Sequence, residues 1–287
     1  MDHKEIQRLV DEALAEDGAW DDKTSAYLGI GDKGIRAKLQ ARASGVVAGL
    51  DVARVVFEER DPKTSFNAMV SDGDRVHSGD VVAEIAGRAA GVLSAERVAL
   101  NFLQHLSGVA TLTAQFVECV AGTGIRILDT RKTTPLLRRL EKYAVRVGGG
   151  ENHRFNLSDM LLVKENHFRA IGGSRTLIAL LKKKRPPGLI EVEVDSLTFF
   201  RELLGAPVDR IMLDNFSPKE VSEAVGALNE YRGSHPEYQP ALEVSGGIDL
   251  TNARNYAIKG VDYISIGALT HSAPALDLSL EVVPDEP

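Results

Sequence analysis

Polar and charged residues in the second half of the sequence recur where apolar, β-branched runs end. Six such runs occur, and each leads directly into residues with ionisable, hydroxyl or backbone groups suited to ligand binding. The ends carry, in chain order, Asp129-Thr130-Arg131-Lys132, Lys164-Glu165-Asn166-His167, Glu193 with Asp195, Asp214-Asn215, Ser245-Gly246-Gly247 and Gly267-Ala268. Ligands of α/β proteins bind at the carboxyl ends of parallel strands. We therefore expect these residues to line one site.

Positive charge is concentrated around the first two of these ends. Residues 131–169 contain nine Lys or Arg against four Asp or Glu, a local balance of +5 in a chain of net charge −7. Arg138, Arg139 and Lys142 are interpreted as an exposed helix face. The remaining basic candidates lie beside strand ends or after the Gly148-Gly149-Gly150 run; they are Arg131, Lys132, His153, Arg154 and Lys164. A concave site lined by arginines predicts a carboxylate or phosphate ligand.

Two glycine-containing loops predict a phosphate site. Ser245-Gly246-Gly247 precedes a helical pattern, and Ile266-Gly267-Ala268 follows the last strand. Glycine lets backbone N–H groups approach a phosphate, and a helix N-terminus adds its dipole. The acids at neighbouring strand ends, Glu193 and Asp214, are suited to a divalent cation or to ribose hydroxyls. Together these groups favour a polyanionic substrate with Mg²⁺.

Other reaction classes remain open on these residues alone. A Schiff-base aldolase acting on a sugar phosphate would need a desolvated lysine at a strand end, and Lys164 is the candidate. A paired-acid hydrolase through Glu193 and Asp214 fits the basic surroundings less well. Serine hydrolysis of the α/β-hydrolase kind lacks its G-x-S-x-G motif.

The elements that must position these residues alternate between strands and helices. Strands are expected at 125–128, 160–163, 189–194, 211–213, 242–244 and 263–266, with helical patterns at 175–184, 218–231 and 251–258. Such alternation predicts parallel strands with crossover helices. Six strands are too few for a complete eight-stranded barrel, and no dinucleotide fingerprint follows the first of them. The pattern favours an incomplete α/β barrel.

The first third of the chain has a different secondary-structure pattern. The spacing predicts helices over 3–16 and 51–60, short strands with turns between residues 35 and 91, and a long helix from Ser94, as its N-cap, to Val120. The chain is therefore expected to contain a mixed α/β layer before the barrel.

Composition excludes several classes of protein. The net charge of −7 argues against nucleic-acid or anionic-membrane binding, and the single cysteine, Cys119, excludes an internal disulfide and a cysteine-based metal site. The first residues do not form a signal peptide, and no apolar run reaches the length of a membrane span. A cytoplasmic enzyme is the expected class.

The run LDTRKTTPLLRRLEKYAVRVGGGENHRFNLSDMLLVKENH, residues 128–167, resembles the signature of the quinolinate phosphoribosyltransferase family, also called nicotinate-nucleotide pyrophosphorylase (carboxylating). The resemblance continues through ALAEDGAWDDKTS, SAERVALNFLQHLSGVAT, EVEVDS, IMLDNFSP, EVSGGI and ISIGALTHS, in the expected order. One departure is Leu136, where many members carry glycine after Thr-Thr-Pro, and the turn is expected to differ there.

The resemblance implies a fold, a reaction and an assembly. The fold is an N-terminal α/β sandwich (1–107) packed on an incomplete α/β barrel (108–273), with the tail 274–287 expected to pack back on the sandwich. The reaction joins quinolinate to phosphoribosyl pyrophosphate and releases pyrophosphate and CO₂, forming nicotinate mononucleotide for NAD biosynthesis. The assembly is a homodimer with its active sites at the interface.

The resemblance also assigns roles to residues. Quinolinate-binding arginines fall on Arg131, Arg154 and Arg97, the last supplied by the partner subunit. Lys132, His153 and Lys164 match other basic site residues, with Thr130 in the same loop, while Glu193 and Asp214 match acids near the ribose and Mg²⁺. The Ser245-Gly246-Gly247 and Ile266-Gly267-Ala268 loops match phosphate loops. Competing members of the same superfamily are a molybdenum-transport-associated relative and the nicotinate phosphoribosyltransferases.

Overall fold

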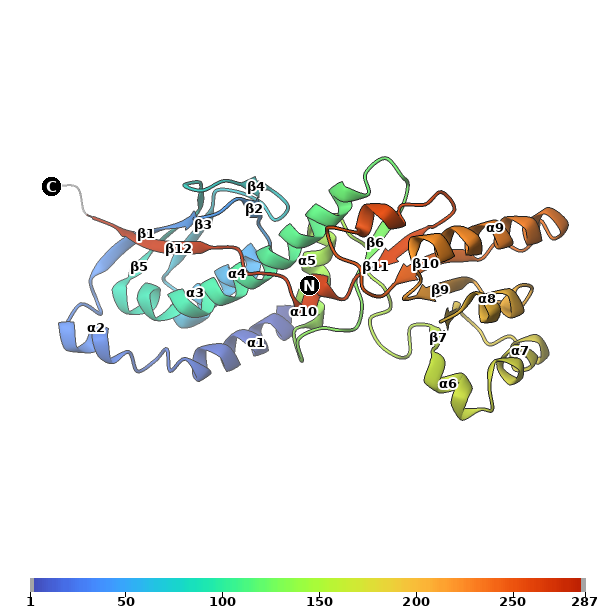
Figure 1. Ribbon diagram of the computed structural model, residues 1–287. Helices are drawn as coiled ribbons and strands as arrows, with labels where there is room; N and C mark the ends of the chain where they lie inside the picture. Colours follow the sequence, from blue (N-terminus) through green and yellow to red (C-terminus); the bar gives the residue numbers. More distant parts are fainter. Residues whose placement is uncertain (1–2, 285–287) are drawn as a thin grey trace. The chain divides into compact units, whose positions relative to one another are not determined.

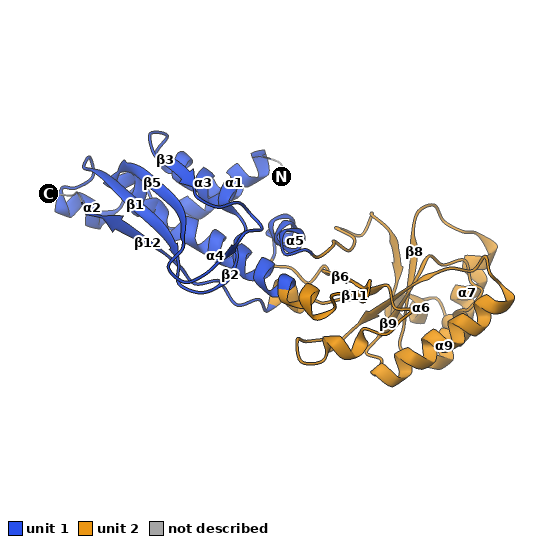
Figure 2. Ribbon diagram, turned by 90° about the horizontal axis from the view of Figure 1, so that it is seen from above, with its two compact units in different colours: residues 1–114, 135–149, 272–287 blue, residues 115–134, 150–271 orange. Residues whose placement is uncertain are grey.

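The computed structural model describes residues 3–284, which divide into two compact units (Figure 2). Within the described residues, unit 1 comprises residues 3–114, 135–149 and 272–284, and unit 2 comprises residues 115–134 and 150–271. The units interleave in sequence, so the chain passes between them several times. The sequence predicts two continuous domains, 1–107 and 108–273, whereas each unit here consists of separate segments. The predicted domain bounds stay a prediction.

Unit 1 is a mixed α/β layer built on an antiparallel sheet of order β12-β1-β5-β3. Helices α1, α3 and α4 lie along one face of this sheet (Figure 1). The C-terminal strand β12 pairs with β1, placing Leu280 opposite Leu39. The elements of this unit are α1 (His3–Glu16), α2 (Lys23–Leu28), β1 (Gly34–Ala41), β2 (Gly45–Val46), α3 (Leu50–Arg60), β3 (Ser65–Ala68), β4 (Arg75–Val76), β5 (Val81–Arg88), α4 (Ala89–Cys119, ending in unit 2), α5 (Arg138–Val147) and β12 (Leu278–Val283).

Unit 2 contains the parallel strands that the sequence predicts. All six runs form one parallel sheet of order β6-β11-β10-β9-β8-β7, an incomplete barrel whose edge strands β6 and β7 do not pair with each other. The expected fold class is thus confirmed. Its elements are β6 (Arg126–Leu128), β7 (Leu161–Val163), α6 (Glu165–Ala170), α7 (Ser174–Lys183), β8 (Ile190–Val194), α8 (Leu197–Leu203), β9 (Arg210–Asp214), α9 (Pro218–Ser234), β10 (Ala241–Ser245), η1 (Ala253–Tyr256), β11 (Tyr263–Ser265) and α10 (Ala268–His271).

Local sequence explains where the crossover helices begin. Ser217 is the N-cap of α9 and accepts a hydrogen bond from the Glu220 N–H, while the Glu220 carboxylate accepts from the Ser217 N–H, and Pro218 follows the cap. The reciprocal bonds satisfy two donors that a helix start leaves open. Ser196 caps α8 with a single bond, since its hydroxyl accepts from the Phe199 N–H. Each cap starts a helix a few residues after its strand ends, so the short loop between strand and helix is fixed at both ends and can carry site residues.

Three local predictions are wrong. Ser94 is not an N-cap, because α4 begins at Ala89 and the Ser94 hydroxyl donates to the Ala90 carbonyl inside the helix. The pattern at 251–258 forms only the short 3₁₀ helix η1. Lys142 is 3% exposed instead of lying on a solvated face.

Leu136 adopts a backbone conformation typical of glycine, the residue that many family members carry at this position. Its φ is +68°, a left-handed conformation that glycine adopts without strain and that leucine rarely adopts. The leucine side chain is 69% exposed, so the turn keeps the backbone that a glycine would favour.

Among residues 3–284, helices that combine enough length with enough apolar character to cross a lipid bilayer are absent.

Candidate active site

A cavity of about 590 Å³ opens at the carboxyl ends of the unit 2 strands. The structure brings every predicted site residue of unit 2 to this cavity; they are Thr130, Arg131, Lys132, His153, Arg154, Lys164, Glu193, Asp214, Ser245, Gly246, Gly247, Ile266, Gly267 and Ala268. Arg97 is not among the lining residues, since it lies exposed on α4 in unit 1. Sequence reasoning missed the rest of the lining, which consists of Leu162, Met212, Ile248, Asp249, Ser265 and His271.

One side of the cavity is built for an anion with more than one charged group. Arg131 follows β6, and Arg154 lies in the loop between α5 and β7. Burial lowers the pKa of the Arg154 guanidinium, and the positive charge of Arg131 lowers it further. An anion bound between the two guanidinium groups would offset this repulsion. The pair is therefore suited to a ligand carrying carboxylates.

The cavity lining also combines a lysine with two acids. The Lys164 ammonium pairs with the Glu193 carboxylate, which ends β8 and is 13% exposed. On the neighbouring strand β9, Asp214 accepts a hydrogen bond of 2.9 Å from the Asn215 amide. Lys164 is 44% exposed and ion-paired, whereas a Schiff-base lysine must be desolvated. This geometry disfavours the aldolase alternative.

The glycine loops approach the cavity closely with their backbone. Gly246 has a φ of +95° and Gly247 a φ of +62°, so both lie in the left-handed region. A Cβ atom on Gly267 would lie 2.9 Å from the Lys132 Cδ atom, so the lysine side chain would have to shift to accommodate it. The Thr270 hydroxyl donates to the Lys132 carbonyl at 2.7 Å and so joins this loop to the one after β6. The loops are shaped for a phosphate group.

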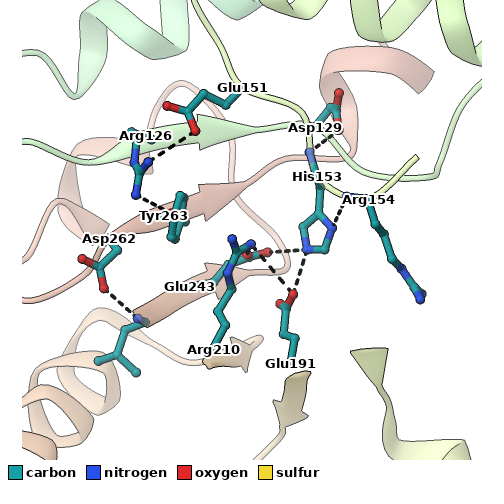
Figure 3. Close-up of polar contacts among 11 residues, drawn as sticks. Arg126, Asp129, Glu151, His153, Arg154, Glu191, Arg210, Glu243, Asp262 and Tyr263 are labelled. Carbon is teal, nitrogen blue, oxygen red and sulfur yellow. Dashed lines mark hydrogen bonds and ion pairs between the residues drawn. The ribbon is translucent and has the colours of Figure 1, made fainter. Parts of the chain in front are cut away.

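His153 connects the cavity with the interior of the barrel (Figure 3). Its backbone N–H donates to Asp129 at 2.9 Å, and its Nδ1 atom accepts the Arg154 N–H at 2.7 Å. Its Nε2 atom lies 3.1 Å from the Glu191 carboxylate and 3.6 Å from the Glu243 carboxylate, both fully buried. The side chain is thereby held from two directions.

His153, Glu191 and Glu243 have the composition of a metal site, with one potential ligand atom from each within 4.8 Å of the others. Two contacts argue against that function. Because Nδ1 accepts a hydrogen bond, the neutral imidazole carries its proton on Nε2, and a protonated nitrogen cannot bind a metal. In addition, Arg210 already donates to Glu243 at 2.7 Å. We interpret the cluster as an ionic network in which Arg210 hydrogen-bonds Glu243 and the His153 ring lies at ion-pair distance from both carboxylates.

The comparisons with known proteins agree along the whole chain. Residues 22–107 match the family described as quinolinate phosphoribosyl transferase, N-terminal domain, and residues 109–281 match its C-terminal domain. A probable nicotinate-nucleotide pyrophosphorylase [carboxylating] of Bacillus subtilis is 40% identical over 288 residues, covering 98% of this chain and 95% of that protein. The nicotinate-nucleotide pyrophosphorylase [carboxylating] of Mycobacterium leprae is 42% identical over 250 residues, covering 86% of each.

Solved structures give the same result. The nicotinate-nucleotide pyrophosphorylase from Francisella tularensis superposes with a TM-score of 0.89 at 38% identity, over 99% of this chain and 98% of that chain. The matches in sequence and in structure cover both units, and they indicate the same family. The chain belongs to the quinolinate phosphoribosyltransferase family.

Proposed function

We propose that this protein is a decarboxylating phosphoribosyltransferase that converts quinolinate and phosphoribosyl pyrophosphate to nicotinate mononucleotide, pyrophosphate and CO₂. The observation that carries the proposal is the pairing of Arg131 with Arg154 in a cavity that also holds two glycine loops. One substrate needs cations for two carboxylates, and the other needs backbone donors for phosphate. The names of the close relatives support the same substrates.

The reaction has two bond-breaking steps. The lone pair of the quinolinate ring nitrogen forms a bond to ribose C1, and the C1–O bond breaks with its electrons leaving on pyrophosphate. The bond from ring C2 to its carboxylate then breaks, CO₂ departs, and the electron pair left on C2 takes up a proton. The alkylated ring nitrogen is cationic, so it stabilises that electron pair. The protein mainly has to hold two mutually repelling anions in line.

The lining residues divide between these tasks. Arg131 and Arg154 bind the carboxylates of quinolinate, with Thr130 and His153 beside them. Lys132 and Lys164 face the departing pyrophosphate, and Glu193 and Asp214 hold the ribose hydroxyls. The loops Ser245-Gly246-Gly247 and Ile266-Gly267-Ala268 bind the phosphate.

Mg²⁺ is proposed as the cofactor. Glu193 and Asp214 end adjacent strands and line the cavity together, which fits a cation that enters with its phosphate ligand and takes one or two protein carboxylates. When bound, Mg²⁺ would neutralise charge that builds up on the pyrophosphate.

The assembly and location belong to the same proposal. We expect a homodimer in which the partner's Arg97 completes each quinolinate site, because Arg97 is exposed on α4 and has no place in the cavity of unit 2. We also expect a cytoplasmic enzyme that binds neither nucleic acid nor membranes.

Substrate choice tests the proposal. With phosphoribosyl pyrophosphate and Mg²⁺ present, we expect turnover of quinolinate with equimolar CO₂ release, and little turnover of nicotinate. Nicotinate lacks the 2-carboxylate and would leave an arginine unpaired, at a cost of roughly 1–3 kcal/mol or more. Comparable kcat/KM values for the two acids would assign the protein to a nicotinate-using branch. Borohydride trapping of a sugar phosphate on Lys164 would favour the aldolase.

The Arg131→Lys variant tests the carboxylate clamp. Lysine keeps the charge but loses the planar fork that binds a carboxylate through two parallel hydrogen bonds. We expect the KM for quinolinate to rise about tenfold, equivalent to about 1.4 kcal/mol, with an unchanged melting temperature. Arg169→Lys is the matched control, because Arg169 is 68% exposed on α6, forms an ion pair with Glu165 and does not line the cavity. A wild-type KM in Arg131→Lys would contradict the assignment.

A further inference from the structure

A network of buried charge lies beneath the cavity, on the barrel side of His153. Glu191 on β8 and Glu243 on β10 are both 0% exposed, and Arg210 on β9 lies between these strands. The Arg210 guanidinium donates to Glu243 at 2.7 Å and lies 3.8 Å from Glu191. Its other contact is the ring of Tyr263, 4.2 Å from the ring centre (Figure 3). The function proposed above uses neither carboxylate.

Burying two carboxylates costs free energy that one arginine only partly offsets. Burial, and then the charge of Glu191, raise the pKa of Glu243 to about 7. The Arg154 N–H donates to Nδ1 of His153 at 2.7 Å, and a proton on Nδ1 would set two donors against each other. This contact indicates an imidazole with a bare Nδ1 and its proton on Nε2, facing the carboxylates.

The contacts then form a chain from the barrel interior to the site. Nε2 of His153 faces the Glu191 carboxylate at 3.1 Å, and Nδ1 accepts the Arg154 N–H. His153 is 8% exposed, so little of it reaches the cavity. Nδ1 accepts a hydrogen bond, and Nε2 is buried at ion-pair distance from Glu191, which leaves ring carbon as the surface that a ligand can touch.

We propose that Glu191 and Glu243 are positioning residues for the dicarboxylate substrate: they fix the tautomer and orientation of His153, and His153 fixes the backbone that carries the Arg154 guanidinium. This inference rests on the proposed function, since Arg154 is taken to bind quinolinate. His153 accordingly acts through Arg154, by its Nδ1 atom, instead of hydrogen-bonding the substrate.

Glu191→Leu is the test variant. It removes the carboxylate nearest Nε2 and leaves Arg210 and Glu243 as a balanced pair, so the fold should survive. We expect the KM for quinolinate to rise about tenfold, because small misplacements of a binding group are costly. The kcat and the KM for phosphoribosyl pyrophosphate should change less than about threefold. Glu191→Gln, which keeps an oxygen acceptor of the same size, should recover most of the affinity.

Glu141→Leu is the matched control. Glu141 is also 0% exposed and lies 2.9 Å from the Nε2 atom of His105, but both residues belong to unit 1 and neither lines the cavity. The same substitution there removes a histidine–glutamate contact whose glutamate is equally buried and whose histidine is 31% exposed. We expect lower thermal stability with an unchanged KM for quinolinate. A loss of stability alone therefore cannot produce the result expected for Glu191.

Nitrogen NMR of the ¹⁵N-histidine-labelled wild-type protein measures the tautomer without any substrate. His153 is one of 7 histidines, and the spectrum of a His153→Gln variant identifies its signals. We expect a protonated Nε2 and a bare Nδ1. An imidazolium, a protonated Nδ1, or a quinolinate KM in folded Glu191→Leu within twofold of wild type would overturn the positioning role. If wild type turns over no quinolinate, the proposed function fails, and the NMR result still decides the state of His153.

Discussion

Arg97→Ala and Arg131→Ala are each expected to be nearly inactive alone and to regain about a quarter of wild-type activity when their subunits are mixed. Arg131 lines the cavity of unit 2, whereas Arg97 is exposed on α4 of unit 1. Leaving one charge of a desolvated ion pair without its partner costs about 3–5 kcal/mol. Each variant should therefore lose at least a hundredfold in kcat/KM for quinolinate, by about 1.4 kcal/mol per decade.

The expected recovery follows from counting sites. If the partner's Arg97 completes each site, a heterodimer of the two variants holds one intact site and one site that lacks both arginines. Random exchange makes about half of the dimers heterodimers, with one working site in two. The measurement is quinolinate turnover after mass spectrometry has shown complete subunit exchange.

A second mixture controls for non-specific rescue. Arg131 and Lys164 line the same cavity, so a mixture of Arg131→Ala and Lys164→Ala subunits contains no intact site in any dimer. That mixture should stay inactive. If the Arg97→Ala and Arg131→Ala mixture also stays inactive despite exchange, Arg97 acts within its own subunit or has only a structural function.

The strands and their polar ends could be predicted because each signal is local. The β9 segment Arg210–Asp214 is buried over its central three residues, as a parallel strand in a barrel must be, and the apolar run Ile211-Met212-Leu213 is visible in the sequence. The functional ends of such strands then converge by topology alone. This is why residues as distant in sequence as Thr130 and Ala268 could be assigned to one cavity.

The network under His153 could not be predicted because its signal is not local. Glu191 and Glu243 are acids inside apolar runs, a pattern that by itself indicates only an unusual strand. Their proximity depends on β9 lying between β8 and β10, and on a histidine arriving from the loop before β7. The N-cap expected at Ser94 is wrong for a different, local reason, since a serine hydroxyl can bond back to the carbonyl four residues earlier inside a helix.

Gly246→Ala is expected to be among the most damaging single-methyl changes in the site. A Cβ atom at Gly246 would lie 2.3 Å from the Asn215 Oδ1 atom and 2.9 Å from its backbone nitrogen, at a φ of +95°. Asn215 cannot move freely, because its N–H donates to the Ser245 carbonyl at 2.8 Å and its amide donates to Asp214. Left-handed strain and overpacking together predict a loss of about 2–5 kcal/mol in the free energy of unfolding.

To accommodate the added methyl group, Gly246 and Asn215 would have to move apart. This movement should weaken substrate binding, because it separates the phosphate loop from the strand end that carries Asp214. We expect the KM for phosphoribosyl pyrophosphate to rise at least about tenfold, measured with the melting temperature. Gly247→Ala is the matched control: its φ is +62° and a Cβ atom there meets nothing within 4 Å. It should lose only the left-handed penalty of about 1–2 kcal/mol. If the two variants lose equal stability, the contact with Asn215 does not explain the need for glycine at position 246.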